Sequence, residues 1–350
     1  GEEPEVTQGG SPWYVRVMLG IAGWVGALFL LGSVFGGLAL LLLTSSVPAV
    51  GALGVIACFL AVIIYRSTKQ NDFAEQFAFA VSLAGQALLV FSILSGLDLF
   101  RNTNEFVSQV QLVAMLSAVL QLVLFLLVPN YLHRIWSALI GVGAVVFLLN
   151  QFGLYPFTLA LVLAAAVAVW LQEFRWVKHG EMLRALGYSL VIVSIFHLLT
   201  QNYFWEGGRF WQNIFGIEPL GGQTGELLAS LALGLVLIVL VLTLLKRGAV
   251  ALTSRIGIAS LVLAVLVALI GVYAPGITVG LVIVLLGFSQ GNTILTGLGL
   301  VTVVVFVSQF YYLLHLTLLE KSVLLVVSGL GLLAVRQVLR HFWPKEISNA

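Results

Sequence analysis

Long apolar runs, separated by short polar segments, fill most of the chain. Residues 231–245 (LALGLVLIVLVLTLL) are typical, because this run is apolar on all sides and does not alternate with the two-residue period of a strand. A helix that crosses a bilayer needs about 20 such residues. The runs predict helices at residues 15–43, 47–65, 73–97, 106–128, 132–149, 155–171, 182–200, 226–245, 250–274, 276–291, 293–313 and 321–341. The sequence therefore predicts an all-α fold, a polytopic transmembrane helix bundle of about 12 spans.

The basic residues predict an orientation for this bundle. With the N-terminus in the cytoplasm, all but three of the 16 lysine and arginine residues fall on the cytoplasmic side, and Arg101, Arg209 and Lys321 face out. The run at 276–291 reaches only about 24 Å across a hydrocarbon core of about 30 Å, so a re-entrant segment stays open there. Without that span the basic C-terminus would lie outside. We therefore predict that both termini are cytoplasmic, N-in and C-in.

Composition excludes the soluble classes of protein. Hydrophobic residues make up 61% of the chain and charged residues 9%, whereas soluble domains carry about 25% charged residues. The formal charge of +2 is too small to suggest nucleic-acid binding. Cys58 is the single cysteine, so the chain has no disulfide framework and no CxxC motif. The lipid bilayer is the partner that composition predicts.

The predicted domain organisation is simple. The sequence predicts a disordered polar tail at residues 1–12 and a single transmembrane helical domain at residues 13–343. It predicts a short tail at residues 344–350. A short charged loop would divide the domain into halves, 13–172 and 182–343. The long connection at residues 201–225, rich in aromatic residues and glycine, is predicted to be external.

Polar side chains at mid-depth point to an intramembrane network on the third and fourth helices. Its members are Ser82, Gln86, Ser117 and Gln121. On antiparallel neighbours, Gln86 should meet Ser117 in depth and Ser82 should meet Gln121. Hydrogen bonds of this kind contribute roughly 0.6 kcal/mol on average, which favours a role in pairing the helices. A polar path for a substrate is the alternative.

A second polar cluster is predicted at the outer face. It comprises His197, Gln201 and Asn202 after the seventh helix, and Tyr311, Tyr312, His315, Glu320 and Lys321 after the eleventh. The tyrosines suit an interfacial belt, and at this depth the polar groups stay hydrated. We interpret the cluster as a shallow binding or docking surface. Paired histidines on separate helices can also ligate haem or a metal, but no supporting motif accompanies these two.

Motifs for catalysis are missing from the sequence. It contains no Walker loop, no HExxH and no GxSxG. We therefore predict no catalytic residue, no metal site and no cofactor.

Three stretches carry a family resemblance: PWYVRVMLGIAGWVGALFLL, DFAEQFAFAVSLAGQALLV and GNTILTGLGLVTVVVFVSQFYYLLHLTLLEKSVLLVVSGLGLLAVR. Together they resemble an uncharacterised bacterial family of inner-membrane proteins, domain-of-unknown-function family 4401. The likeness covers residues 12–336, and the YY/H/LLEKS segment is the most telling part. It implies a multi-pass protein of the bacterial inner membrane, often encoded beside a membrane-anchored GDYxxLxY-type protein. It implies no activity, ligand or site residue.

Three function classes fit these observations. We favour a non-enzymatic, partner-binding subunit or scaffold with an outer-face docking surface, for which a GDYxxLxY-type protein is the candidate partner. The first alternative is a secondary transporter of a small or apolar solute, against which stands the near absence of charge at mid-membrane. The second alternative is a haem- or quinone-associated membrane protein. An absorption spectrum and the proteins that co-purify would separate the three classes.

Overall fold

The structure is a computed structural model of the whole chain. It describes residues 46–67, 71–97, 106–173, 179–200, 213–218 and 220–313, with scattered positions between 18 and 37 and between 322 and 337. The predicted first and twelfth helices and both tails therefore lie wholly or mostly outside the described residues. Where the chain is described it is helical, and those residues form no strand.

Helices occupy the predicted positions from residue 47 to residue 313. They are α3 (Val47–Ser67), α4 (Asp72–Gly96), α5 (Phe106–Leu127), α6 (Tyr131–Leu149), α7 (Tyr155–Gln172), α8 (Gly180–Leu199), α10 (Gly222–Arg247), α11 (Arg255–Gly271), α12 (Pro275–Ser289) and α13 (Thr293–Leu313). The ninth predicted helix begins five residues late, because Ser254 caps α11 by accepting a hydrogen bond from the Gly257 backbone N–H at 3.0 Å. The preceding residues form the turn after α10.

Six of the helical segments are long and apolar enough to cross a membrane. They are Val47–Ser67, Asp72–Gly96, Phe106–Leu127, Tyr131–Gln172, Gly180–Leu199 and Thr224–Arg247. Tyr131–Gln172 comprises α6 and α7, joined by a π-turn in which Gly153 has a φ of +75°. Three shorter apolar helices follow at Arg255–Gly271, Pro275–Ser289 and Thr293–Gln309. An all-helical membrane protein is thus the architecture of the described chain.

The buried and exposed residues of α5 are those expected of a helix that contacts lipid. Its buried residues are Gln109, Gln121 and Leu124, so two of the three are polar. Apart from Ser108 in its first turn, the residues that it exposes are large and apolar, among them Met115, which is 53% exposed. This pattern is the reverse of that on a water-soluble amphipathic helix. It fits a helix whose outer face meets hydrocarbon.

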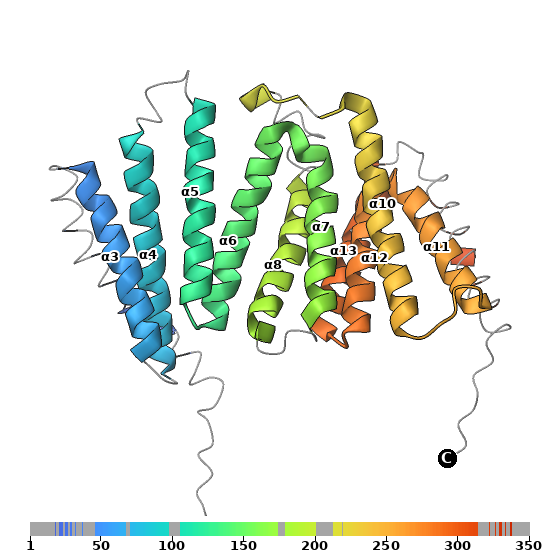
Figure 1. Cartoon of the computed structure of the whole chain (residues 1–350), viewed down its shortest axis with the longest axis horizontal. Helices are drawn as coiled ribbons and strands as arrows, with labels where there is room; N and C mark the ends of the chain where they lie inside the picture. The colour runs from blue at the N-terminus through green and yellow to red at the C-terminus, as the bar shows by residue number, and fades with distance from the viewer. Residues whose placement is uncertain are drawn as a thin grey trace, which may run out of the picture.

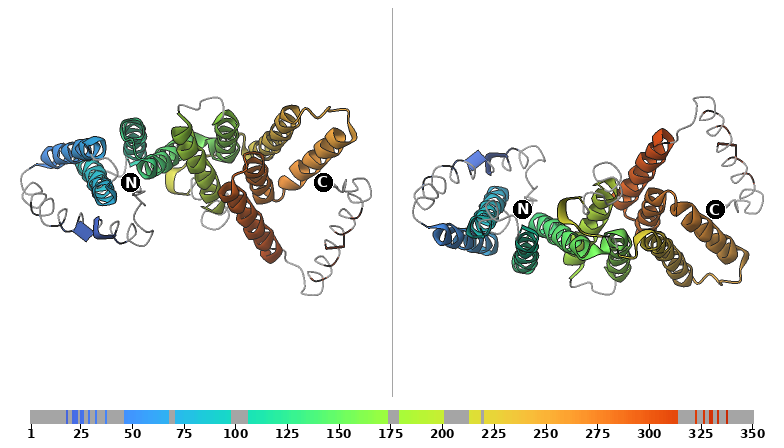
Figure 2. Two further views of the ribbon diagram at one scale, coloured as in Figure 1. Left: turned by 90° about the horizontal axis from the view of Figure 1, so that it is seen from below. Right: turned by 90° about the horizontal axis from the view of Figure 1, so that it is seen from above.

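The helices stand side by side with alternating directions (Figure 1). Viewed along their axes they form an elongated row, with α3 and α4 at one edge and α11 near the other (Figure 2). The lysine and arginine residues that the structure describes all gather at one end, at or near the termini of α3, α6, α8, α10 and α11: Arg66, Arg134, Arg184, Lys246, Arg247 and Arg255. We call this the basic end. α8 and α13 finish at the opposite end (Figure 1).

The largest core cluster lies in the middle of the row. Its apolar residues come from α6, α7, α8, α10, α12 and α13, so both predicted halves of the domain contribute to it. Trp170 is the largest of its side chains and is 1% exposed. Its indole ring packs against the backbone position of Gly187 on α8, where a Cβ atom would lie 2.8 Å from the ring.

Glycines bring two pairs of helices into close contact. On α12, a Cβ at Gly280 would lie 2.5 Å from Cγ2 of Val303 and 2.9 Å from the backbone N of the same residue on α13. On α3, a Cβ at Gly54 would lie 2.8 Å from the backbone O of Gly85 on α4. Small residues let helix backbones approach in this way in lipid, where packing drives association.

Candidate ligand sites within the membrane

A chain of buried polar side chains joins α4, α5 and α6. Nε2 of Gln121 donates to Oε1 of Gln86 at 2.7 Å, and Nε2 of Gln86 donates to Oγ of Ser82 at 3.1 Å. Oγ of Ser82 lies 2.9 Å from Nε2 of His133, and Nδ1 of His133 lies 3.2 Å from Oγ of Ser137. All five side chains are buried, and His133 is 0% exposed. We call this series the polar chain.

The polar chain contains three of the four residues predicted for the network, but they pair differently. Gln86 bonds to Gln121 instead of Ser117, and Ser82 bonds to His133 instead of Gln121. The difference amounts to one helical turn, because α5 begins beyond the level at which α4 ends (Figure 1). Ser117 is half-buried, and no hydrogen bond of its side chain occurs within the described part of the chain.

His133 is the member that sequence reasoning missed. It follows the cap of α6, where Oδ1 of Asn130 accepts from the His133 backbone N–H at 3.1 Å while Nδ2 of Asn130 donates to Oε2 of Glu75 at 2.8 Å. The rings of Tyr65 and Phe79 meet the imidazole edge-on, with centroids at 5.6 and 5.9 Å. The available signal was its spacing, since His133 and Ser137 lie one turn apart on the same helix face.

A first groove lies between α6 and α8. We call it the His197 groove. It has a volume of about 560 Å³ and is lined by Trp136, Leu139, Ile140, Gly143, Val146, Phe147, Asn150, Ile192, Val193, Phe196, His197 and Thr200. None of these residues carries a formal charge when His197 is neutral. Its size falls within the roughly 300–1,000 Å³ of small-molecule sites.

His197 is the unusual residue of this groove. Its side chain is 3% exposed, and its Nε2 atom has no hydrogen-bond partner. The backbone nearby is satisfied, because Oγ1 of Thr200 donates to the carbonyl O of His197 at 2.8 Å. Oδ1 of Asn150, at the end of α6 on the other wall, accepts from Oγ1 of Thr158 at 2.8 Å. A buried polar atom without a partner is costly in hydrocarbon, so the ring nitrogen is available to a ligand.

A second groove lies between α5, α6, α7 and α8. We call it the Gln121 groove. Its volume is about 470 Å³, and its lining is apolar except for Gln121 and Ser137, the two ends of the polar chain. Oε1 of Gln121 is buried and has no hydrogen-bond partner.

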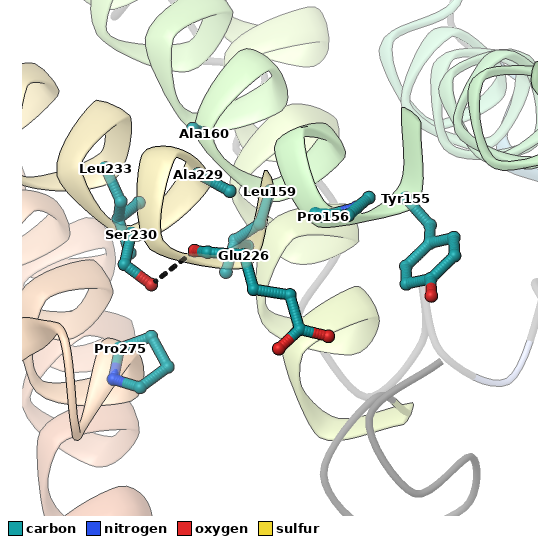
Figure 3. A pocket seen from close by; sticks show the side chains of 9 residues that line it. All are labelled: Tyr155, Pro156, Leu159, Ala160, Glu226, Ala229, Ser230, Leu233 and Pro275. Atoms are coloured by element: carbon teal, nitrogen blue, oxygen red, sulfur yellow. Dashed lines mark hydrogen bonds between the residues drawn. The ribbon is translucent and has the colours of Figure 1, made fainter. Parts of the chain in front are cut away.

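Two further hollows differ from the grooves, one by its smaller volume and the other by its more polar lining. Near the starts of α7, α10 and α12, a hollow of about 240 Å³ contains Glu226, and Oγ of Ser230 donates to the Glu226 backbone O at 3.1 Å (Figure 3). Tyr155 and Pro275 lie on opposite sides of it (Figure 3). At the basic end, a hollow of about 620 Å³ contains Glu173, paired with Arg184. The first of these hollows is lined by no side-chain atom that is both buried and without a hydrogen-bond partner. In the second, Oε1 of Gln290 is such an atom, while Nε2 of the same residue donates to the backbone O of Trp170 at 3.1 Å.

The described residues contain no group of three or more histidine, cysteine, aspartate or glutamate side chains that could hold a metal ion. The polar side chains that line the two grooves are neutral ones, with His197 neutral.

One known protein family matches the whole of the helical region described above. The family described as "Domain of unknown function (DUF4401)" matches residues 12–341. The chain belongs to the DUF4401 family. No curated protein and no solved structure matches it.

Within this DUF4401 chain, the predicted outer-face cluster is only partly described. His197 lies in the last turn of α8, and Tyr311 and Tyr312 lie in the last turn of α13, at the same end of the bundle (Figure 1). The remaining members fall outside the described residues: Gln201, Asn202, His315, Glu320 and Lys321. His197 itself is buried at the wall of the His197 groove, between α6 and α8.

Proposed function

We propose that this protein is a non-enzymatic subunit of the bacterial inner membrane that binds a neutral, lipid-soluble molecule in the His197 groove. The observation that carries the proposal is the unpartnered Nε2 atom of the buried His197, at the wall of a groove of about 560 Å³. Apolar and aromatic side chains with a few convergent polar groups are typical of small-molecule sites.

The lining chemistry favours a quinone–quinol molecule. A charged ligand would find no counter-charge here, because no lysine, arginine, aspartate or glutamate lines the groove. Trp136, Phe147 and Phe196 offer aromatic faces against which a flat ring can stack. A neutral imidazole donates from one nitrogen and accepts at the other. The imidazole of His197 also hydrogen-bonds to the backbone carbonyl of Tyr155, and because Nε2 has no partner this bond is made by Nδ1–H. Nε2 is therefore an acceptor and can bond the hydroxyl of a quinol.

Lipid extraction followed by mass spectrometry tests the proposal. Protein purified in mild detergent should carry a quinone that is depleted in Gly143→Leu, since Gly143 lines the groove and a Cβ there would meet open space. Gly297→Leu on α13 is the matched control, because its Cβ also has no neighbour within 4 Å and it lies away from the groove. Quinone retained equally by Gly143→Leu, His197→Leu and the control would refute the proposal. A Soret band lost in His197→Leu would replace it with haem binding.

The basic end is proposed to face the cytoplasm. All described lysine and arginine residues lie there, as the positive-inside rule requires of cytoplasmic loops. In a Cys58→Ala background, a cysteine at Thr253, exposed in the α10–α11 turn, should react only with reagents on the cytoplasmic side. A cysteine at Glu218, exposed before α10, should react only from outside. The reverse pattern would invert the orientation.

Docking of a membrane-anchored GDYxxLxY-type protein on the outer-face cluster is a separate proposal. It is supported by the shared end at which α8 and α13 finish (Figure 1). His315→Ala and Glu320→Ala should then lower recovery of that partner in affinity purification, with no change in the yield of folded protein. Undiminished recovery in both variants would count against it.

A further inference from the structure

The polar chain has a direction. Gln121 donates its amide N–H to Gln86, and Gln86 donates its own to Ser82. The Ser82 oxygen therefore accepts from one side, and its hydroxyl proton can go to Nε2 of His133, at 2.9 Å. Once Nε2 accepts, the neutral imidazole carries its proton on Nδ1 and donates it to Oγ of Ser137, at 3.2 Å.

This direction leaves one unused group at each end. At the first end, Oε1 of Gln121 is an acceptor with no donor. At the other end, the Ser137 hydroxyl accepts from His133, and its own proton has no other acceptor among the described residues. Gln121 is 3% exposed and Ser137 is 1% exposed, so neither end is served by bulk solvent. Aligned hydrogen bonds of this kind strengthen one another, which makes the two ends a stronger acceptor and a stronger donor.

Both ends line the Gln121 groove. They also lie near each other along the groove wall. A Cβ on Gly141 would lie 3.3 Å from Cβ of Gln121, and Gly141 is one helical turn from Ser137 on the same face of α6. Gln121 and Ser137 therefore belong to neighbouring turns of the groove wall.

We propose that the Gln121 groove is a binding site for a lipid alcohol, a neutral molecule with one hydroxyl on an apolar body. One hydroxyl satisfies both ends, because its oxygen accepts from Ser137 and its proton goes to Oε1 of Gln121. The rest of the lining is apolar and uncharged, and its volume of about 470 Å³ accommodates the start of an acyl or isoprenoid chain. The site is separate from the quinone–quinol site proposed for the His197 groove, with which it shares only Val146.

Photo-crosslinking of the full-length protein in membrane vesicles tests this inference. The probe is a long-chain alcohol that carries a diazirine, and the control probe is its methyl ether, which accepts a hydrogen bond but cannot donate one. The alcohol should label peptides from α5 and α6 about fivefold more strongly than the ether, as expected for one hydrogen bond. Equal labelling by the two probes would overturn the proposal and assign the two ends to a buried water.

Two alanines of α7 provide a matched pair of variants. Both are exposed on the helix, but Ala165 lines the Gln121 groove and Ala168 does not. Ala165→Phe should fill the groove and reduce labelling by the alcohol about tenfold, whereas Ala168→Phe should leave it within about twofold. Undiminished labelling in Ala165→Phe would refute the site. Gly143→Leu, which fills the other groove, should leave this labelling unchanged, so failure of one proposal is distinguishable from failure of the other.

Discussion

Helices α4, α5 and α6 are connected by side chains that hydrogen-bond across them, whereas α7, α8, α10, α12 and α13 are connected mainly by apolar packing. The second region also contains buried hydroxyls, but most of them donate a hydrogen bond to a backbone carbonyl of their own helix. Ser194 donates to the carbonyl O of Leu190 at 2.8 Å, and Thr302 donates to that of Leu298 at 2.7 Å. In this way a hydroxyl stays satisfied without linking two helices.

The difference shows how much each kind of contact contributes in lipid. Burial of apolar surface drives little association there, because lipid tails are as apolar as leucine. Interhelical hydrogen bonds average about 0.6 kcal/mol, since the separated helices also find polar partners. Separated helices find no such substitute for the close backbone contacts that glycine allows. The glycine contacts should therefore be the most sensitive to substitution, and single members of the polar chain less so.

The largest effect is expected for Gly280→Leu on α12. Its Cβ would lie 2.5 Å from Val303 Cγ2 and 2.9 Å from the Val303 backbone N, so α12 and α13 must separate. We expect a loss of about 3 kcal/mol in the free energy of unfolding, measured by detergent titration in mixed micelles. Gly297→Leu, with no neighbour within 4 Å, should change it by less than about 0.5 kcal/mol. Equal effects of the two variants would contradict the close contact.

An intermediate effect is expected for His133→Leu. The substitution removes the bonds to Ser82 and Ser137 and leaves both hydroxyls without their imidazole partner. The bond to Ser82 is interhelical and contributes about 0.6 to 1.7 kcal/mol, and the bond to Ser137 lies within α6 and contributes about 0.5 to 1.5 kcal/mol, so the cost should be about 1 to 3 kcal/mol in the same titration. A cost below that of any single glutamine variant would show that His133 is not the centre of the polar chain.

Much of the architecture followed from apolar run length alone. The helices between residues 47 and 313 lie where the sequence predicted them, because a run that crosses lipid must satisfy its backbone within one helix. The count of about 12 spans stays a prediction. The short tenth run became α12, a helix of 15 residues, and its glycines explain its close contact with α13.

The site was less predictable, for a geometrical reason. Depth matching predicted that Gln86 meets Ser117, whereas Gln86 bonds to Gln121, because the sequence alone does not fix the relative height of α4 and α5 to within one turn. His133 was overlooked because it follows the cap of α6, at a position typical of the membrane interface. Only the packing of Tyr65 and Phe79 around it makes it a buried residue. Both grooves depend on contacts between helices distant in sequence.

A smaller effect is expected for Gln86→Leu. Gln86 forms the middle of the polar chain, and its loss should cost about 1 kcal/mol or less while α4 stays attached through other contacts. A double-mutant cycle with Gln121→Leu isolates their bond of 2.7 Å, and the coupling energy should be about 0.6 kcal/mol. A coupling energy of zero would mean that the two glutamines contribute independently.

The smallest effect is expected for Ser117→Ala, which separates the predicted pairing from the observed one. If Gln86 bonded Ser117, the substitution would remove a buried partner and cost about as much as Ser82→Ala, roughly 0.6 kcal/mol. In the structure Gln86 is already bonded on both sides, to Ser82 and to Gln121, and Ser117 lies half-buried outside the polar chain. Ser117→Ala should therefore change the free energy of unfolding by less than about 0.3 kcal/mol, within the range of neutral surface substitutions. Detergent titrations of both serine variants, run side by side, decide between the two registers. Equal losses in Ser117→Ala and Ser82→Ala would place α5 one turn away from its position in the structure, and the polar chain would then end at Ser117.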